Sequence, residues 1–153
     1  MSMKNIISKL VTGRDLCFNE ARDAMRIIMR GEATDAQIGC ILTALRMKGE
    51  KVEEVAGFAS AMREYCQRIT PKVKSRLLDT CGTGGNTFKS FNISTISAFV
   101  AAGAGACVAK HGNRSYTSQC GSADVLDALG FRLDLTPLEV ARLIEKVGVG
   151  FIY

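Results

Sequence analysis

The stretch of sequence that decides the fold is Leu77-Leu78-Asp79-Thr80-Cys81-Gly82-Thr83-Gly84-Gly85-Asn86. Its apolar start predicts a short strand over 77–79, and the glycines that follow predict a tight loop. Because glycine has no Cβ, the backbone of such a loop can approach a phosphate closely and aim successive N–H groups at it. We therefore predict a strand that runs into an anion-binding loop.

A second set of donors follows this loop, at the start of a helix predicted over 94–103. The sequence there is Asn92-Ile93-Ser94-Thr95. A helix N-terminus carries unpaired N–H donors and a partial positive charge, and the hydroxyl of Ser94 or Thr95 can donate to a phosphate or coordinate a Mg²⁺ that the substrate carries. The loop lacks the GK[ST] ending of a P-loop and the dinucleotide-binding spacing. A plain strand-to-helix turn with a Ser/Thr cap is the alternative.

Two further polar clusters follow later in the chain. Lys110-His111-Gly112-Asn113-Arg114 comes directly after a strand predicted at 107–109, and Gly121-Ser122-Ala123-Asp124 opens a helix predicted over 121–129. The carboxyl ends of parallel strands share one edge of a sheet, where α/β proteins bind ligands. The first cluster predicts an anion clamp and Ser122 a further phosphate donor. The alternatives are solvated surface charges for the first and ordinary capping for the second.

The glycines divide the chain, since ten of the 15 lie after residue 70. Before that point, helical periodicity predicts a helix over 18–30, a second capped by Thr34 and stopped by Gly49, and a third over 52–69 that ends before Pro71. These features predict a helical domain over residues 1–70.

After a basic connector at 70–76, short apolar runs alternate with helices, which is typical of βα units. Thr136, Pro137 and Glu139 predict the start of a last helix, through a capping box with proline at the first helical position. A strand over 149–153 follows. The fold class predicted is α/β, with a small N-terminal all-helical domain and then the first half of a parallel-sheet α/β domain over residues 71–153.

Composition excludes several classes of protein. With 153 residues, 47% of them apolar, the chain is neither disordered nor collagen-like, and no apolar run is long enough to cross a bilayer. Without a secretory signal we expect a cytosolic protein, whose six cysteines are free thiols that mostly fill the core. The net charge of +5 is spread evenly, which favours an anionic small molecule over nucleic acid as the partner.

Taken together, these segments resemble anthranilate phosphoribosyltransferase of tryptophan biosynthesis, a family of the nucleoside phosphorylase/phosphoribosyltransferase type. The resemblance rests on DTCGTGG at 79–85, NIST at 92–95, KHGNR at 110–114 and GSADVLDALG at 121–130, in this order and spacing. The helical half agrees through residues 37–49 and GFASAMR at 57–63. The likeness therefore covers essentially the whole chain.

The resemblance implies transfer of the phosphoribosyl group from 5-phosphoribosyl 1-diphosphate (PRPP) to the amino group of anthranilate. The products are N-(5-phosphoribosyl)anthranilate and diphosphate, Mg²⁺ is bound, and the enzyme forms homodimers through its helical domain. The family's diphosphate and metal site corresponds here to Gly82, Thr83, Gly84, Gly85, Asn86, Asn92, Ser94 and Thr95, with Ser94 as the metal ligand. Lys110 and Ser122 would face phosphate groups, and Asn113 would lie near anthranilate.

The implied reaction needs no nucleophilic side chain. Negative charge builds on the leaving diphosphate and positive charge on the ribose, so preorganised donors, Mg²⁺ and positioning of the amine supply the catalysis. The amine loses a proton late in the reaction. His111, the one histidine of the chain, is the candidate base.

The chain departs from the family pattern in sequence and in length. Asn86 stands where the family has an acidic residue, Thr87 where glycine is common, and Gln119 where a basic residue is frequent. Members of the family are about twice as long as this chain. We therefore expect an N-terminal part that lacks the family's acidic Asp-Glu pair for Mg²⁺ and the arginine that contacts anthranilate, and that has little activity alone.

Two alternatives stay open from the sequence. The first is an enzyme like the pyrimidine nucleoside phosphorylases, which also combine a helical domain, an α/β domain and a glycine-rich phosphate loop. The second is a non-catalytic fragment that binds an anion or forms a dimer.

Overall fold

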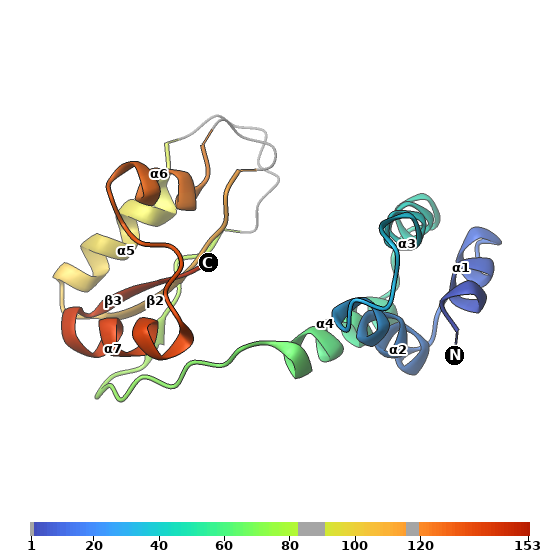
Figure 1. Cartoon of the computed structure of the whole chain (residues 1–153), viewed down its shortest axis with the longest axis horizontal. Coiled ribbons are helices and arrows are strands. Elements are labelled where there is room, and N and C mark those ends of the chain that lie inside the picture. Colours follow the sequence, from blue (N-terminus) through green and yellow to red (C-terminus); the bar gives the residue numbers. More distant parts are fainter. Residues whose placement is uncertain (1, 83–90, 116–119) are drawn as a thin grey trace. The chain divides into compact units, whose positions relative to one another are not determined.

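The computed structural model describes residues 2–82, 91–115 and 120–153, which form two compact units, Met1–Cys66 and Gln67–Tyr153 (Figure 1). The first unit is all-helical. The second holds a parallel sheet with helices packed against it. This confirms the predicted fold class. In the described part of the chain, no helix has the length and apolarity that a membrane span requires.

Four helices make up the first unit: α1 (Met3–Val11), α2 (Phe18–Met29), α3 (Asp35–Lys48) and α4 (Val52–Tyr65). Helix α2 packs against α4, and α1 packs against α3. The buried core includes Ile6, Leu10, Leu16, Ile41 and Leu45. Gly57 lets α4 lie close to α2, because a Cβ there would come within 2.8 Å of the Ala21 Cβ and would also collide with the carbonyl of Phe18.

Helix α1 was not among the helices predicted from the sequence, although the sequence contains a helix cap and helical spacing of apolar residues at this position. The Ser2 side chain accepts a hydrogen bond from the N–H of Asn5, and Ile6 and Leu10 repeat at helical spacing on the buried face. Thr34 caps α3 as predicted, with Gln37 completing its capping box.

Helix α4 ends at Tyr65, four residues before the predicted Ile69, because Cys66 adopts an extended conformation. The apolar stripe continues in the sequence to Ile69. The first unit, however, ends at Cys66, and the residues that follow belong to the second unit. Periodicity alone therefore overestimates the length of this helix.

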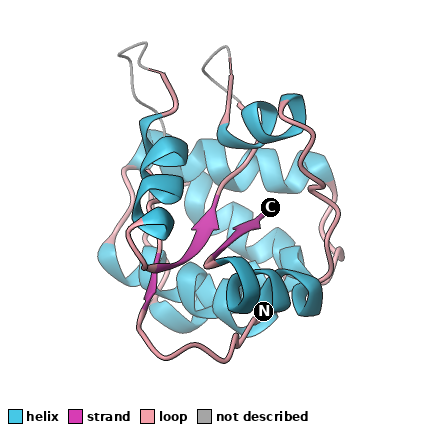
Figure 2. Cartoon of the chain, turned by 90° about the vertical axis from the view of Figure 1, so that its left-hand side faces the viewer, coloured by secondary structure: helices cyan, strands magenta, loops and turns pink. Residues whose placement is uncertain are grey.

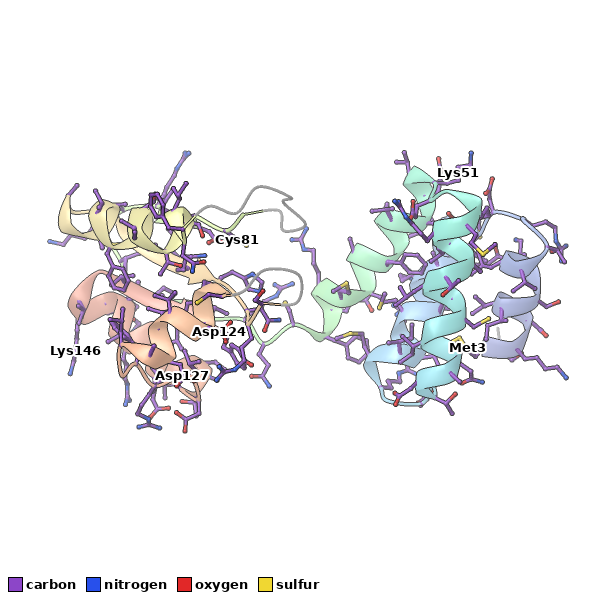
Figure 3. The ribbon with its side chains drawn as sticks, turned by 90° about the horizontal axis from the view of Figure 1, so that it is seen from above. Met3, Lys51, Cys81, Asp124, Asp127 and Lys146 are labelled. Carbon is purple, nitrogen blue, oxygen red and sulfur yellow. The ribbon has the colours of Figure 1, made fainter. Side chains whose placement is uncertain are left out.

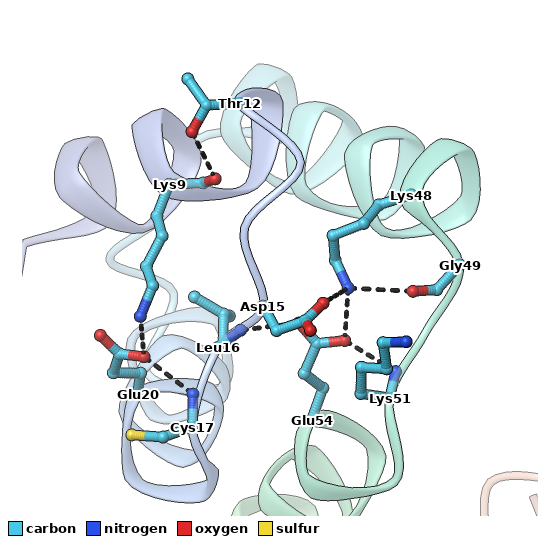
Figure 4. Close-up of polar contacts among 10 residues, drawn as sticks. All are labelled: Lys9, Thr12, Asp15, Leu16, Cys17, Glu20, Lys48, Gly49, Lys51 and Glu54. Carbon is cyan, nitrogen blue, oxygen red and sulfur yellow. Dashed lines mark hydrogen bonds and ion pairs between the residues drawn. The ribbon is translucent and has the colours of Figure 1, made fainter.

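The connection between α3 and α4 contains a buried ion pair (Figure 4). Glu54 is fully buried, and its carboxylate accepts hydrogen bonds from Lys48 Nζ at 2.9 Å and from the N–H of Leu16 and Lys51, each at 2.8 Å. Lys48 Nζ also lies 2.7 Å from Asp15. Burial alone would raise the pKa of Glu54, but these three donors lower it below its ordinary value.

The second unit contains strands β1 (Leu77–Leu78), β2 (Cys107–His111) and β3 (Val149–Ile152), which pair in parallel in the order β1-β2-β3 (Figure 2). Its helices are α5 (Ile93–Gly103), α6 (Ser122–Ala128) and α7 (Pro137–Val147), and α5 and α7 pack against β2 and β3. The Thr136 capping box and Pro137 open α7 as predicted.

Strand β2 is longer than predicted, because Lys110 and His111 belong to it rather than to a loop. Lys110 pairs in register with Phe151 and His111 with Ile152. Polar residue types suggested a loop here, whereas pairing with a strand about 40 residues later in the sequence keeps them extended.

The prediction that the cysteines mostly fill the core is wrong. Cys17, Cys66, Cys81 and Cys120 are exposed, and Cys40 and Cys107 are half-buried. Every cysteine lies in the described part of the chain, and no two of them are joined by a disulfide, as predicted. The apolar character of the residue type does not by itself place these thiols inside.

Replacing Glu54 with alanine should destabilise the first unit by about 3 kcal/mol, because it leaves the Lys48 charge and two N–H groups without their buried acceptor. Urea unfolding followed by circular dichroism measures the loss. The matched control is Glu53→Ala, which removes an exposed carboxylate from the same helical turn and should change the stability by less than about 0.5 kcal/mol.

The pH dependence supplies an independent check of the same contact. A lowered pKa means that the Glu54 contribution is complete above its ordinary value of 4.5 and is lost as the pH falls through the lower folded value. Glu54→Ala should therefore lose less stability than the wild-type chain over this acid range. If Glu54→Ala and Glu53→Ala changed the stability by the same amount at neutral pH and at acid pH, the assigned Glu54 contact would be wrong.

Candidate functional site

The carboxylate of Asp79 joins the ends of the first two strands. Its Oδ1 accepts hydrogen bonds from the N–H of Cys81 at 2.9 Å and from the N–H of His111 at 3.1 Å. Cys81 begins the loop after β1, and His111 ends β2. Because β1 and β2 are parallel, both lie at the carboxyl edge of the sheet. The prediction that the two polar clusters share one edge is confirmed.

The N-terminus of α5 is held at this edge by two further contacts. Thr80 Oγ1 donates to the carbonyl of Ser94 at 2.7 Å, and Asn92 Nδ2 donates to the carbonyl of Cys120 at 3.3 Å. Asn92 is the N-cap residue of α5, but its side chain makes no capping bond. In the first turn of α5, the N–H groups of Ile93 and Thr95 donate to the carbonyls of Phe91 and Asn92 at 2.7 and 3.0 Å, whereas the described residues offer no acceptor for the N–H of Ser94.

Thr95 and Lys110 lie beneath the edge rather than on it. Each is only 3% exposed, and both line a cavity of about 40 Å³ with apolar residues of the surrounding helices and strands. Lys110 Nζ donates to the carbonyl of His111 at 2.7 Å. Thr95 Oγ1 has no hydrogen-bond partner among the described residues. The Lys110 ammonium and the Thr95 hydroxyl are thus buried below the edge of the sheet. The sequence alone does not show whether these two side chains are buried or exposed.

Asn113 and Ser122 meet where β2 leaves the sheet and α6 begins. The carbonyl of Asn113 accepts hydrogen bonds from the N–H of Ala123 at 3.2 Å and from Ser122 Oγ at 3.5 Å. Gly112 donates its N–H to the carbonyl of Ile152 at 3.1 Å, at the end of β3. The third strand therefore ends beside the same residues.

Asp124, on α6, binds the described residues on both sides of 116–119 (Figure 3). Its Oδ2 accepts from the N–H of Ser115 at 3.0 Å and of Gly121 at 2.8 Å, and its Oδ1 accepts from Arg114 at 3.0 Å. The two N–H groups and then the arginine lower the pKa of Asp124. The position of Asp124, three residues after the N-cap Gly121, is the sequence signal that indicates this contact.

Arg114 does not form the anion clamp that the sequence predicts. Its guanidinium binds Asp127 Oδ2 at 2.7 Å and Asp124 Oδ1 at 3.0 Å. Asp127, followed by Asp124, raises the pKa of Arg114 above its ordinary value. The carboxylates compensate its charge, so Arg114 tethers the segment to α6.

Glycine is required at positions 112 and 121. A Cβ on Gly121 would lie 2.6 Å from the carbonyl oxygen of Asn113 and would collide with the N–H of Ser115. A Cβ on Gly112 would lie 2.8 Å from the Phe151 ring and would collide with Ser122 Oγ. These close approaches pack the loop after β2 against the start of α6.

The remaining predicted residues divide into two groups. Gly82 is exposed at the start of the first loop, and His111 is exposed at the end of β2, with its Nδ1 3.5 Å from Cys81 Sγ. Thr83, Gly84, Gly85 and Asn86 lie outside the described residues. Among the residues that the structure describes, no three His, Cys, Asp or Glu side chains gather as a metal site would require.

Comparison with known proteins identifies both units. Residues 4–66 match the model of the glycosyl transferase family's helical bundle domain, and residues 74–153 match that family's a/b domain. Anthranilate phosphoribosyltransferase of Persephonella marina is 52% identical over 151 residues, which are 99% of this chain and 44% of that protein. The expectation that the relatives are about twice as long is therefore confirmed.

Two solved structures agree with this result. Anthranilate phosphoribosyltransferase of Thermus thermophilus matches with a TM-score of 0.83 and 41% identity, over 96% of this chain and 44% of that one. The Saccharomyces cerevisiae enzyme in complex with PRPP and Mg matches with a TM-score of 0.82 and 26% identity, over 98% of this chain and 46% of that one. These matches favour the phosphoribosyltransferase over the nucleoside phosphorylase alternative. The chain belongs to the glycosyl transferase family, and it spans less than half the length of the anthranilate phosphoribosyltransferases that it resembles.

Proposed function

We propose that the protein to which this sequence belongs transfers the phosphoribosyl group of PRPP to the amino group of anthranilate and releases diphosphate. The observation that carries the proposal is the Asp79 contact, which brings the glycine-rich loop and the end of β2 to one edge. The similarity to anthranilate phosphoribosyltransferases, one of them solved with PRPP and Mg, supplies the substrates.

In this proposal the diphosphate binds at the N-terminus of α5. The donors are the N–H groups of Gly82 and Ser94, together with the side chain of Asn92. The Lys110 ammonium lies at the end of β2 and adds positive charge close by. Ser122 Oγ, at the start of α6, is a donor to a second phosphate. Donors held in place before the reaction stabilise the charge that develops on the leaving group.

Ser94 is the described residue that fits a magnesium ligand. It lies in the first turn of α5, where Thr80 holds its carbonyl, and its hydroxyl is a hard oxygen ligand of the kind that Mg²⁺ accepts. The described residues hold no acidic cluster, so Ser94 is the ligand that this part of the protein would contribute. Bound Mg²⁺ would neutralise charge on the leaving diphosphate.

Asn113 and His111 border the place where the acceptor amine would arrive. We assign Asn113 to anthranilate, as the resemblance implies, and His111 to removal of the proton that the amine loses. His111 is exposed at the end of β2, so its imidazole can exchange a proton with water. A cytoplasmic location remains part of the prediction.

The proposed partner is a second copy of the chain, bound through the helical unit. A groove of about 670 Å³ runs between α1 and α3, and its lining includes Leu10, Val11, Ala36 and Met47. Met47 is 84% exposed and Val11 59% exposed. Apolar side chains this exposed and this close together are typical of an interface, and a two-fold axis would pair the groove with itself.

Replacing Met47 with aspartate should convert a dimer into a monomer, because it places a charge in the lining of this groove. Sedimentation equilibrium measures the mass. The matched control is Met62→Asp, which changes an exposed methionine of α4 outside the groove and should leave a dimer. A wild-type chain that sediments as a monomer at every concentration would refute the proposed partner.

Isothermal titration with PRPP tests the proposed function. We expect binding that strengthens when Mg²⁺ is present, and Ser94→Ala should weaken the Mg²⁺-dependent binding by roughly tenfold, which is the size of one contact to a charged group. The control Ser97→Ala removes a hydroxyl one turn further along α5 and should have no effect.

Two results would contradict the proposal. The first is the absence of any PRPP binding, which would leave only the assembly role. The second is turnover of a pyrimidine nucleoside and phosphate by a protein that does not turn over PRPP and anthranilate. If wild type and Ser94→Ala bound PRPP equally well in the presence of Mg²⁺, only the assignment of Ser94 as a metal ligand would fail.

A further inference from the structure

Cys81 and His111 form a thiol–imidazole pair at the carboxyl edge of the sheet. Cys81 Sγ lies 3.5 Å from His111 Nδ1, and both residues are exposed. They come from different strand ends, and Asp79 holds both backbones by accepting their N–H groups. The backbone contacts to Asp79 therefore fix the positions from which the two side chains approach each other.

The contacts of the pair suit transfer of the thiol proton to the imidazole. Among the described residues, Cys81 Sγ lies within hydrogen-bonding distance of the Gly82 carbonyl, at 3.3 Å, and of His111 Nδ1. Asp79 accepts the backbone N–H groups of both residues, and Lys110 Nζ donates to the carbonyl of His111. A neighbouring base that takes the thiol proton leaves a thiolate, the nucleophilic form of cysteine.

We propose that Cys81 is a site of reversible oxidation by hydroperoxides, and that its oxidation blocks anion binding at the adjacent Gly82. The thiolate sulfur attacks one oxygen of hydrogen peroxide, an S–O bond forms, and the O–O bond breaks. Sulfur is oxidised to a sulfenic acid, the peroxide is reduced to water, and the proton first held by His111 ends on the departing hydroxide.

The loss of anion binding after oxidation follows from the position of the Cys81 sulfur. It rests on the proposed function. Cys81 directly precedes Gly82, the first glycine of the loop, and its sulfur lies within contact of the Gly82 carbonyl. An added oxygen therefore lies beside the backbone of Gly82, whose N–H the proposed function assigns to the diphosphate, and it competes with the phosphate for this donor. Thiols reduce the sulfenic acid and restore the site.

The other exposed cysteines of the chain provide internal controls. Cys66 Sγ donates to the carbonyl of Arg63 at 3.2 Å, and Cys17 lies at the N-cap of α2. The only histidine of the chain is His111, so neither control thiol has an imidazole beside it. Exposure alone predicts equal oxidation of all three, whereas the proposal predicts a large excess at Cys81.

The experiment treats the reduced full chain with limiting hydrogen peroxide, traps sulfenic acid with dimedone, and measures each cysteine by peptide mass spectrometry. Cys81 should be modified roughly tenfold faster than Cys17 or Cys66, and His111→Gln should lower its rate to theirs. Equal modification in the wild-type chain would overturn the proposal without any variant. An unchanged Cys81 rate in His111→Gln would overturn the role of the imidazole.

Titration with PRPP and Mg²⁺ tests the block on binding. The peroxide-treated chain should lose binding and regain it with dithiothreitol, whereas Cys81→Ser should keep the binding that it has before treatment. Full binding by a chain oxidised at Cys81 would overturn the block. If the reduced wild-type chain binds no PRPP, the proposed function and the block fail together, and the dimedone measurement still decides the reactivity of Cys81.

Discussion

The site depends on a single acceptor, Asp79 Oδ1, which takes the N–H groups of Cys81 and His111. Parallel pairing brings the strand ends to one edge, but it does not set the distance between the loops that leave them. The carboxylate sets that distance, because one oxygen atom must reach both amides. Thr80, next to Asp79 in the sequence, fixes the start of α5 because its hydroxyl donates to the carbonyl of Ser94. The loop after β2, the glycine-rich loop and the helix N-terminus are thus connected within a few bonds of Asp79.

The helical unit rests on a different kind of constraint. Glu54 and Lys48 are a buried ion pair, and such pairs stabilise a fold only when hydrogen bonds satisfy the remaining lone pairs. Here the N–H groups of Leu16 and Lys51 do so. One carboxylate therefore ties the segment between α1 and α2 to the turn between α3 and α4. The result is a fixed arrangement of α1 and α3, which carry the groove proposed to bind a second copy.

Local signals explain how much of this structure was predictable. The caps at Thr34 and Thr136 and the existence of the strand at Leu77–Leu78 depend on neighbouring residues and were predicted correctly, although this strand ends one residue before the predicted Asp79. The long-range contacts were not. Lys110 belongs to β2 because it pairs with Phe151, and Arg114 is held by Asp124 and Asp127 rather than left for an anion. Residue type shows that a side chain can bind phosphate, whereas only the packing shows which charges are already compensated.

Backbone hydrogen exchange measured by NMR tests whether one carboxylate couples the two loops. In Asp79→Ala, the amides of Cys81 and His111 should both exchange faster, while the amides of β3 keep their protection. Asp134→Ala, which removes an exposed carboxylate bound to Arg132, should change neither amide. Unchanged exchange at both amides in Asp79→Ala, or a change at one of them alone, would show that Asp79 does not couple the loops.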